Sequence, residues 1–218
     1  MRLISKNGFD FICDGDFIFF IERAENHNIR FFKTDLDKLL EIGLDEYTNI
    51  KFGKSWGTTQ SPYNECIKLG NGEYLTSSFY DSTIYRHSND GNKIKEYNIG
   101  HFETGFDTTE SIALDKNGNL WIAQPPSHYV GQFSLDTEKE LFRIGGDFEN
   151  PDTFDHPEQV RVFGDFVYVC DMGNKRICRI NIDTKELTVY KKFEENTWEY
   201  GQFKTKEIAK LNSGIYEL

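Results

Sequence analysis

Glutamate recurs along this chain at one position, four residues before the last apolar residue of a short alternating run. The four glutamates are Glu65, Glu110, Glu158 and Glu207. Carboxylates that converge are costly unless a cation binds between them or some of them are protonated. Such oxygen ligands suit Ca²⁺, Mg²⁺ or Mn²⁺ better than zinc. If the runs lie side by side, these glutamates predict a divalent metal site.

A structural role for the same glutamates is also consistent with the pattern. A glutamate at the start of each run can accept backbone N–H bonds from the neighbouring unit, or it can lie in solvent. The sequence leaves both interpretations open.

The runs that carry the glutamates belong to a repeat. Each run is followed by a glycine turn and then by a stretch rich in aromatic and β-branched residues, which is typical of a β-hairpin. Three of the turn glycines, Gly72, Gly118 and Gly164, are 46 residues apart. A fixed period of this length indicates one supersecondary unit used several times.

Two further alternating runs complete the third and fourth units. Four antiparallel strands per roughly 40–50 residues predict an all-β fold, a β-propeller of four-stranded blades. We expect a single domain over residues 1–218 with five blades, whose hairpins start near residues 9, 65, 110, 158 and 207. Residues 1–5 would complete the last blade, so that both ends of the chain close it. Six blades are the alternative, and residues 37–42 are either a short helical turn or an extra strand.

Two units resemble known propeller families. Residues 156–177 resemble an NHL repeat, with Pro157 before the first strand, Asp171 at the end of the second, and Arg176 and Ile177 starting the third. Residues 110–123 are similar to blades of the streptogramin lyase group and of the gluconolactonase/regucalcin group. The resemblance implies the propeller fold, but these families include lyases, lactone hydrolases and binding scaffolds.

The gluconolactonase resemblance also implies a metal site. In that group, Glu, Asn and Asp ligands come from the same region of several blades, which implies Glu65, Glu110, Glu158 and Glu207 as the ligands here. The chain departs from the family set because it offers four glutamates and no asparagine.

The ends of the second strands are expected at the same mouth of the central channel. The residues at these ends are Glu22, Ser77, Gln124 and Asp171, and we predict them as ligand contacts; Asp171 has the structural alternative of accepting hydrogen bonds in a turn. His128 and His156 are predicted near this mouth as well. A streptogramin-lyase-like reaction would need such a histidine as acid or base.

Composition narrows the classes of partner. The net charge is −11, from 36 acidic and 25 basic residues, which argues against nucleic acid as a ligand. No apolar run reaches the length of a membrane span, and residues 1–8 lack the apolar core of a signal peptide. The four cysteines lie inside strand patterns without metal-binding spacing. They predict buried thiols in a reducing, cytoplasmic compartment.

Two functions fit these observations. The first is a non-catalytic propeller that binds a small molecule or a protein at the channel mouth. The second is a divalent-metal-dependent hydrolase or lyase that acts on a lactone or cyclic ester, in which the metal would polarise a carbonyl or activate water. The second requires Glu65, Glu110 and Glu158 to converge on one ion.

Overall fold

The computed structural model describes residues 1–5, 10–14, 17–23, 29–34, 39–42, 63–78, 83–88, 92–97, 109–146, 153–203 and 205–218. Between residues 10 and 42 it describes the backbone and not the side chains. The described chain is all-β, apart from a single 3₁₀ turn at Pro125–Ser127. The chain divides into two compact units. One contains Met1–Ser61 and Trp198–Leu218, and the other contains Pro62–Thr197.

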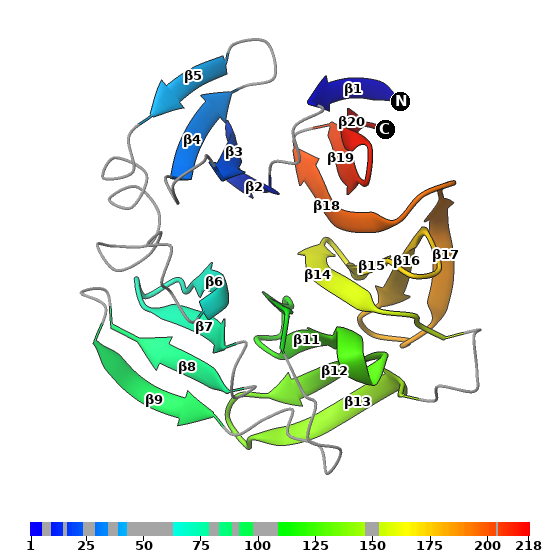
Figure 1. Ribbon diagram of the computed structural model, residues 1–218. Coiled ribbons are helices and arrows are strands. Elements are labelled where there is room, and N and C mark those ends of the chain that lie inside the picture. Colours follow the sequence, from blue (N-terminus) through cyan, green and yellow to red (C-terminus); the bar gives the residue numbers. More distant parts are fainter. Residues whose placement is uncertain are drawn as a thin grey trace. The chain divides into compact units, whose positions relative to one another are not determined.

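The larger unit, Pro62–Thr197, holds three four-stranded antiparallel sheets (Figure 1). The first consists of β6 (Tyr63–Lys68), β7 (Tyr74–Ser78), β8 (Ile84–His87) and β9 (Lys93–Tyr97). The second consists of β10 (Ser111–Leu114), β11 (Leu120–Gln124), β12 (Tyr129–Ser134) and β13 (Lys139–Gly145). The third consists of β14 (Pro157–Phe163), β15 (Phe166–Asp171), β16 (Arg176–Asn181) and β17 (Leu187–Lys192). In each sheet the strands lie in chain order, as in a propeller blade.

The other unit holds two more such sheets. One consists of β2 (Asp10–Asp14), β3 (Phe17–Arg23), β4 (Ile29–Thr34) and β5 (Leu39–Ile42). The other has the order β1–β20–β19–β18, from β1 (Arg2–Ser5), β20 (Gly214–Glu217), β19 (Lys206–Leu211) and β18 (Thr197–Phe203). Because β1 pairs antiparallel with β20, the two ends of the chain share one blade, and the predicted closure is confirmed.

The described residues thus form five four-stranded blades, which confirms the predicted fold class. The first strands of the blade hairpins begin at Asp10, Tyr63, Ser111, Pro157 and Lys206. Of the two alternatives for residues 37–42, the strand is correct for residues 39–42, which form β5 and pair with β4 in the register Thr34↔Leu39, while residues 37 and 38 lie outside the described residues. A single domain over residues 1–218 stays a prediction.

The glycine turns explain why the repeat is so regular. Gly72, Gly118 and Gly164 have φ of 85°, 78° and 59°, a left-handed conformation that glycine adopts without steric cost. In the second of these turns, one oxygen of Asp115 accepts hydrogen bonds from the backbone N–H groups of Asn117 (2.9 Å) and Asn119 (3.0 Å). Each turn reverses the chain between the first two strands of its blade, so the start of the first strand lies beside the end of the second.

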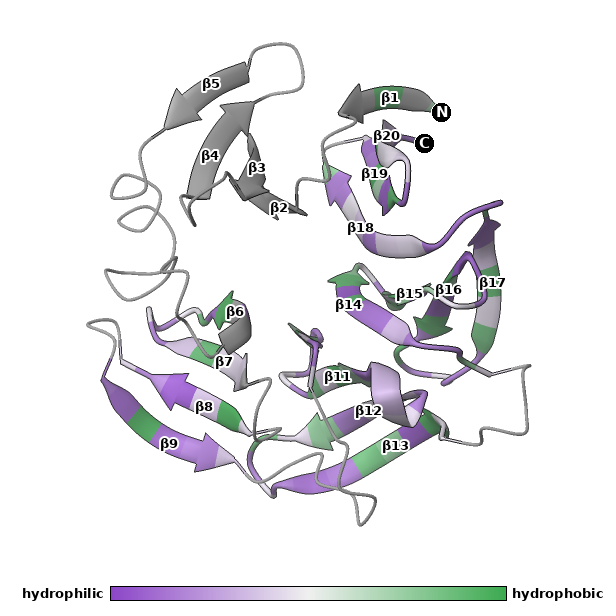
Figure 2. Cartoon of the chain, viewed as in Figure 1, coloured by the Kyte–Doolittle hydropathy of each residue, from purple (hydrophilic) through white to green (hydrophobic). Residues whose placement is uncertain are grey.

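The core of the larger unit lies on both faces of β11, all five residues of which are buried. Leu120 and Ile122 pack in a cluster with Leu75 and Ile84 of the preceding blade. Trp121 and Ala123 point into a second cluster, whose other members include the following residues of the next blade: Val160, Val167, Val169, Cys178 and Ile180. The outer strands β9, β13 and β17 mix hydrophilic and apolar residues (Figure 2), as expected for strands with one solvated face.

Candidate functional site

The strand register places the two predicted groups of site residues at one edge of each blade. Glu65 lies opposite Ser77 in the pair β6–β7, and Pro157, next to Glu158, lies opposite Asp171 in the pair β14–β15. The backbone N–H of Glu110 donates to Ala123 O (3.1 Å), which sets Glu110 across from Gln124. In the larger unit, the starts of the first strands and the ends of the second strands therefore build a common edge.

Glu65 joins its own blade to the next two. Its Oε2 accepts hydrogen bonds from Ser111 Oγ (2.5 Å) and from the backbone N–H of Ile112 (2.9 Å), both on β10. Its Oε1 pairs with the guanidinium of Arg161 on β14. Ser111 Oγ also accepts a hydrogen bond from the backbone N–H of Val160 (3.1 Å). The geometry matches the structural alternative for this glutamate, an acceptor for the backbone of the neighbouring blade, and we call Glu65, Ser111 and Arg161 the interblade latch.

Glu110 and Glu158 lie half-buried next to this latch. Burial, reinforced by the charges of Glu158 and Glu65, raises the pKa of Glu110 from 4.5 to about 7. Burial also raises the pKa of Glu158, whereas the nearby His156 opposes that rise. Glu65 and Glu158 are thus close enough for their charges to affect Glu110, while an ion held between the three glutamates stays a prediction.

The fourth glutamate and Glu22 belong to the other unit. Glu207 lies in β19 and accepts a hydrogen bond from the hydroxyl of Tyr200 (3.0 Å). Glu22 lies in β3, and its side chain is outside the described residues. Metal binding by Glu207 and ligand binding by Glu22 stay predictions.

Ser77, Gln124 and Asp171 are fully buried at the ends of their strands. Gln124 Nε2 contacts Thr109 Oγ1 (3.4 Å). Asp171 accepts hydrogen bonds from three groups, the backbone N–H of Asp155 (2.7 Å), Asn174 Nδ2 (3.0 Å) and Arg176 Nε (2.6 Å). Burial raises the pKa of Asp171, and these donors partly offset that rise. Asp171 thus holds the loop before β14 in place, which agrees with its structural alternative.

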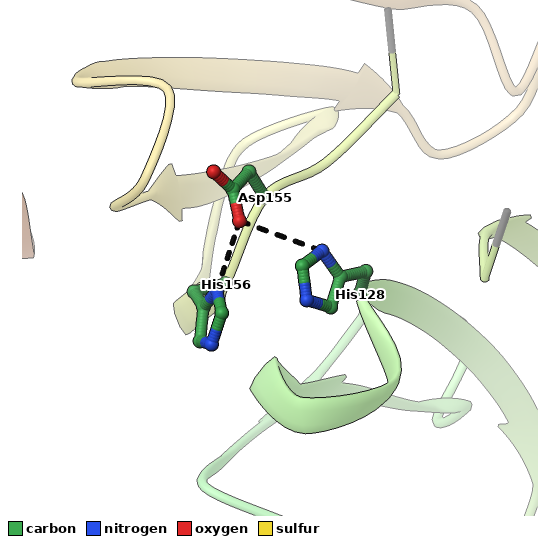
Figure 3. Close-up of side chains that lie close together, drawn as sticks. All are labelled: His128, Asp155 and His156. Atoms are coloured by element: carbon green, nitrogen blue, oxygen red, sulfur yellow. Dashed lines mark hydrogen bonds and ion pairs between the residues drawn. The ribbon is translucent and has the colours of Figure 1, made fainter. Parts of the chain in front are cut away.

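The structure brings His128 and His156 together through a residue that the sequence did not single out. Asp155 Oδ1 lies 2.8 Å from His156 Nδ1 and 3.5 Å from His128 Nδ1 (Figure 3). The centroids of the two imidazole rings are 4.5 Å apart. Asp155 precedes the repeated strand pattern, so the repeat does not reveal it. Its one signal in the sequence is that it is adjacent to His156.

Local backbone geometry positions both histidines. His128 follows the 3₁₀ turn Pro125–Ser127, and its backbone N–H donates to Pro125 O (3.1 Å). His128 and His156 have φ of 53° and 51°, a left-handed conformation that histidine, asparagine and aspartate adopt more often than other residues with a side chain. We call His128, Asp155 and His156 the histidine–aspartate cluster.

Comparisons with known proteins define the class of fold. No protein-family model matches the chain, and no curated protein matches its sequence. Among solved structures, a streptogramin B lyase is 15% identical with a TM-score of 0.54, over 100% of this chain and 70% of its own. Virginiamycin B lyase from Staphylococcus aureus is 16% identical with a TM-score of 0.54, over 100% of this chain and 72% of its own. A WD40 β-propeller domain is 10% identical with a TM-score of 0.58, over 95% of this chain and 61% of its own.

The chain is therefore a β-propeller, similar in fold to streptogramin lyases and to WD40 domains. At these identities the likeness concerns the fold alone, since one fold hosts many activities. Among the described residues, no helix has the length and apolar character needed to cross a membrane.

Proposed function

We propose that this propeller is a non-catalytic binding protein that holds a positively charged group of its ligand at the mouth of the central channel. Glu110 carries the proposal. Its carboxyl group is half-buried and close to two other carboxylates, which together with burial raise its pKa to about 7. Burial is the main cause of the raised pKa of Glu110, and the charges of Glu158 and Glu65 add to it, so a cationic group brought beside Glu110 would favour its ionised form. An ammonium or guanidinium group of the ligand would supply that positive charge.

The affinity for a cationic ligand should depend on pH, because the ligand competes with the proton on Glu110. Below pH 7, Glu110 is mostly protonated, so a cationic ligand must displace that proton before it binds. We therefore expect affinity to rise with pH through about 7 and to level off above it. Below pH 7, each unit of pH should change the dissociation constant by up to about tenfold.

The test is calorimetric titration at pH 6, 7 and 8 with two cationic probes. Spermidine represents a small-molecule ligand, and a tetralysine peptide blocked at both ends represents a protein segment. Glu110→Gln is the test variant. Glu194→Gln, an exposed carboxylate after β17, is the matched control. Circular dichroism verifies that both variants are folded.

We expect one of the two probes to bind the wild type and the control alike, and Glu110→Gln to weaken that binding at least tenfold at pH 8. The probe that binds distinguishes a small-molecule ligand from a protein one. Binding that Glu110→Gln leaves unchanged, or that does not depend on pH, would contradict the proposal, as would the failure of both probes.

The geometry of Glu65 favours binding over the second candidate, a metal-dependent hydrolase or lyase acting on a lactone or cyclic ester. That candidate needs Glu65, Glu110 and Glu158 to converge on one ion. Within the interblade latch, Glu65 already accepts two hydrogen bonds and forms an ion pair with Arg161. These contacts occupy three of the roughly four lone-pair sites of the Glu65 carboxylate, which leaves it little capacity to ligate a metal.

A further inference from the structure

We propose that the histidine–aspartate cluster binds a divalent transition-metal ion of the zinc, cobalt or nickel class. Its ligands are different residues from the glutamates, although His156 lies near Glu158, and the inference goes beyond the proposed function. Two imidazoles and one carboxylate converge from two loops, one between β11 and β12 and the other before β14 (Figure 3).

The distances suit such an ion. One ligand atom from each residue lies within 4.8 Å of the others. Zinc binds imidazole nitrogen and carboxylate oxygen at about 2.0–2.2 Å in a tetrahedron, so neighbouring ligand atoms are about 3.3–3.5 Å apart. The distances from Asp155 Oδ1 to His156 Nδ1 and His128 Nδ1 are 2.8 and 3.5 Å, which span this range. Small side-chain rotations would place all three around one ion.

The ligand types select the class of metal. Imidazole nitrogen favours zinc, cobalt, nickel and copper, whereas Mg²⁺ and Ca²⁺ prefer sites made of oxygen atoms only. Three protein ligands leave at least one position for water or for an exogenous ligand, as in zinc sites that are not closed. The cluster therefore predicts an open transition-metal site, whereas the glutamates predict at most an alkaline-earth or manganese site.

Surrounding groups hold the three ligands in place. The backbone N–H of Asp155 donates a hydrogen bond to the carboxylate of Asp171. The backbone carbonyl of Asp155 accepts a hydrogen bond from the N–H of Gly173 (2.8 Å). A Cβ atom on Gly173 would lie 2.3 Å from Asp155 Oδ2, so only glycine leaves room for this carboxylate. Such support from outside the ligand set is what fixes the orientation of metal ligands in proteins.

A positive φ fixes the direction in which each histidine side chain leaves its loop. Among the described residues, Glu138, Lys175 and Lys185 adopt the same conformation in or next to turns, so it positions the two rings and does not by itself indicate a site. The backbone of Gly145 packs directly against that of His128. A Cβ atom at position 145 would lie 2.3 Å from His128 O, so a side chain there would displace the His128 backbone. The two histidines come from different loops, and their rings are in contact, so both loops present an imidazole to the same place.

The cluster is also accessible from solvent. The side chains of His128, Asp155 and His156 are 18%, 45% and 47% exposed. A chain with a net charge of −11 attracts cations, which favours delivery of an ion to such a surface site.

The experiment titrates metal into chelator-treated full-length protein. Zn²⁺ binding is measured by calorimetry, and Co²⁺ binding by the visible absorption of the ion, which reports its ligand geometry. His128→Asn and His156→Asn are the test variants, because asparagine tolerates the left-handed backbone conformation. Gly173→Ala tests the support of Asp155. Glu194→Gln is the control, since this exposed carboxylate after β17 belongs neither to the cluster nor to the glutamate group.

We expect one ion per chain to bind the wild type and the control with equal affinity. Each asparagine variant should weaken binding at least 100-fold. Gly173→Ala should weaken it roughly tenfold while the protein remains folded by circular dichroism. A hundredfold excess of Mg²⁺ should not compete.

No Zn²⁺ or Co²⁺ binding by the wild type would overturn the inference, and so would full binding by the two asparagine variants. In either case the cluster would be a hydrogen-bonded tether between two loops. Since the spermidine and tetralysine titrations use other residues and contain no metal, failure here and failure of the proposed function can be told apart.

Discussion

At the scale of single residues, Glu110 is a carboxyl group whose charge changes near neutral pH. Burial and the two neighbouring glutamates raise its pKa from 4.5 to about 7. The folded chain therefore binds more protons than the unfolded chain between these two values. It follows that the free energy of unfolding has a contribution that is fully present below pH 4.5 and is lost as the pH rises to about 7.

The variant Glu110→Gln should remove this loss, because glutamine stays neutral throughout. At pH 8 we expect the variant to unfold with a free energy about 1–2 kcal/mol higher than the wild type, less than the full linkage energy because solvent screens a half-buried carboxyl group. At pH 4 the two proteins should be equally stable. Urea denaturation at both pH values measures the difference. An equal gain at pH 4 and pH 8 would show that charge is not the cause.

At the scale of the elements, the interblade latch connects three blades through side chains on β6, β10 and β14. Ile112, whose backbone N–H donates to Glu65, is 1% exposed, and the ion pair between Glu65 and Arg161 is largely buried. Removal of one partner from such a buried arrangement leaves hydrogen-bond donors without an acceptor. The resulting loss in the free energy of unfolding exceeds the net stabilisation that the intact arrangement provides. The latch should therefore have a large effect on the stability of the unit that contains it.

We expect Glu65→Ala to lower the free energy of unfolding by about 2–4 kcal/mol. Glu65→Gln keeps an acceptor for Ile112 and should lose about half as much. A double-mutant cycle with Arg161→Met should give a coupling energy above about 1 kcal/mol, since the two side chains are in contact. Tryptophan fluorescence in urea follows unfolding. A Glu65→Ala protein within about 0.5 kcal/mol of the wild type would mean that the latch contributes no net stability.

The elements themselves were largely predictable, because their causes are local. Turn glycines and alternating runs recur with a period that the sequence shows directly, so the blades and their strand order followed from it. The segment around Leu39 was ambiguous, since its Leu, Glu and Lys content favours a helix while its pairing with β4 makes it a strand. Tertiary pairing overrides a weak local preference in such cases.

The site was less predictable, because its contacts join different blades. The sequence could align Glu65 with Glu110 and Glu158, but the partners of Glu65 lie on two other blades, and a repeat period does not specify packing between blades. Asp155 was missed because it lies outside the repeated strands. His128 and His156 were singled out by residue type, whereas their proximity depends on two loops with unusual backbone conformations.

At the scale of the whole molecule, one blade is assembled from the two ends of the chain. In the pair β1–β20, Arg2 lies opposite Glu217, and Leu3 lies opposite Tyr216. Without β1, the backbone donors and acceptors of β20 would form an unpaired sheet edge, which is prone to pair with other chains. The pairing therefore protects the edge as well as closing the blade.

The same register determines how the molecule responds to a pulling force. Since residues 2 and 217 face each other, tension applied between them acts across the strands, along the direction of the interstrand hydrogen bonds. Under this tension the hydrogen bonds would break one after another. When tension acts parallel to the strands, all of the hydrogen bonds bear it at the same time. Optical-tweezer stretching from the two ends should detach β1 at low force before any other blade opens. A disulfide engineered between positions 2 and 217 should abolish that early event.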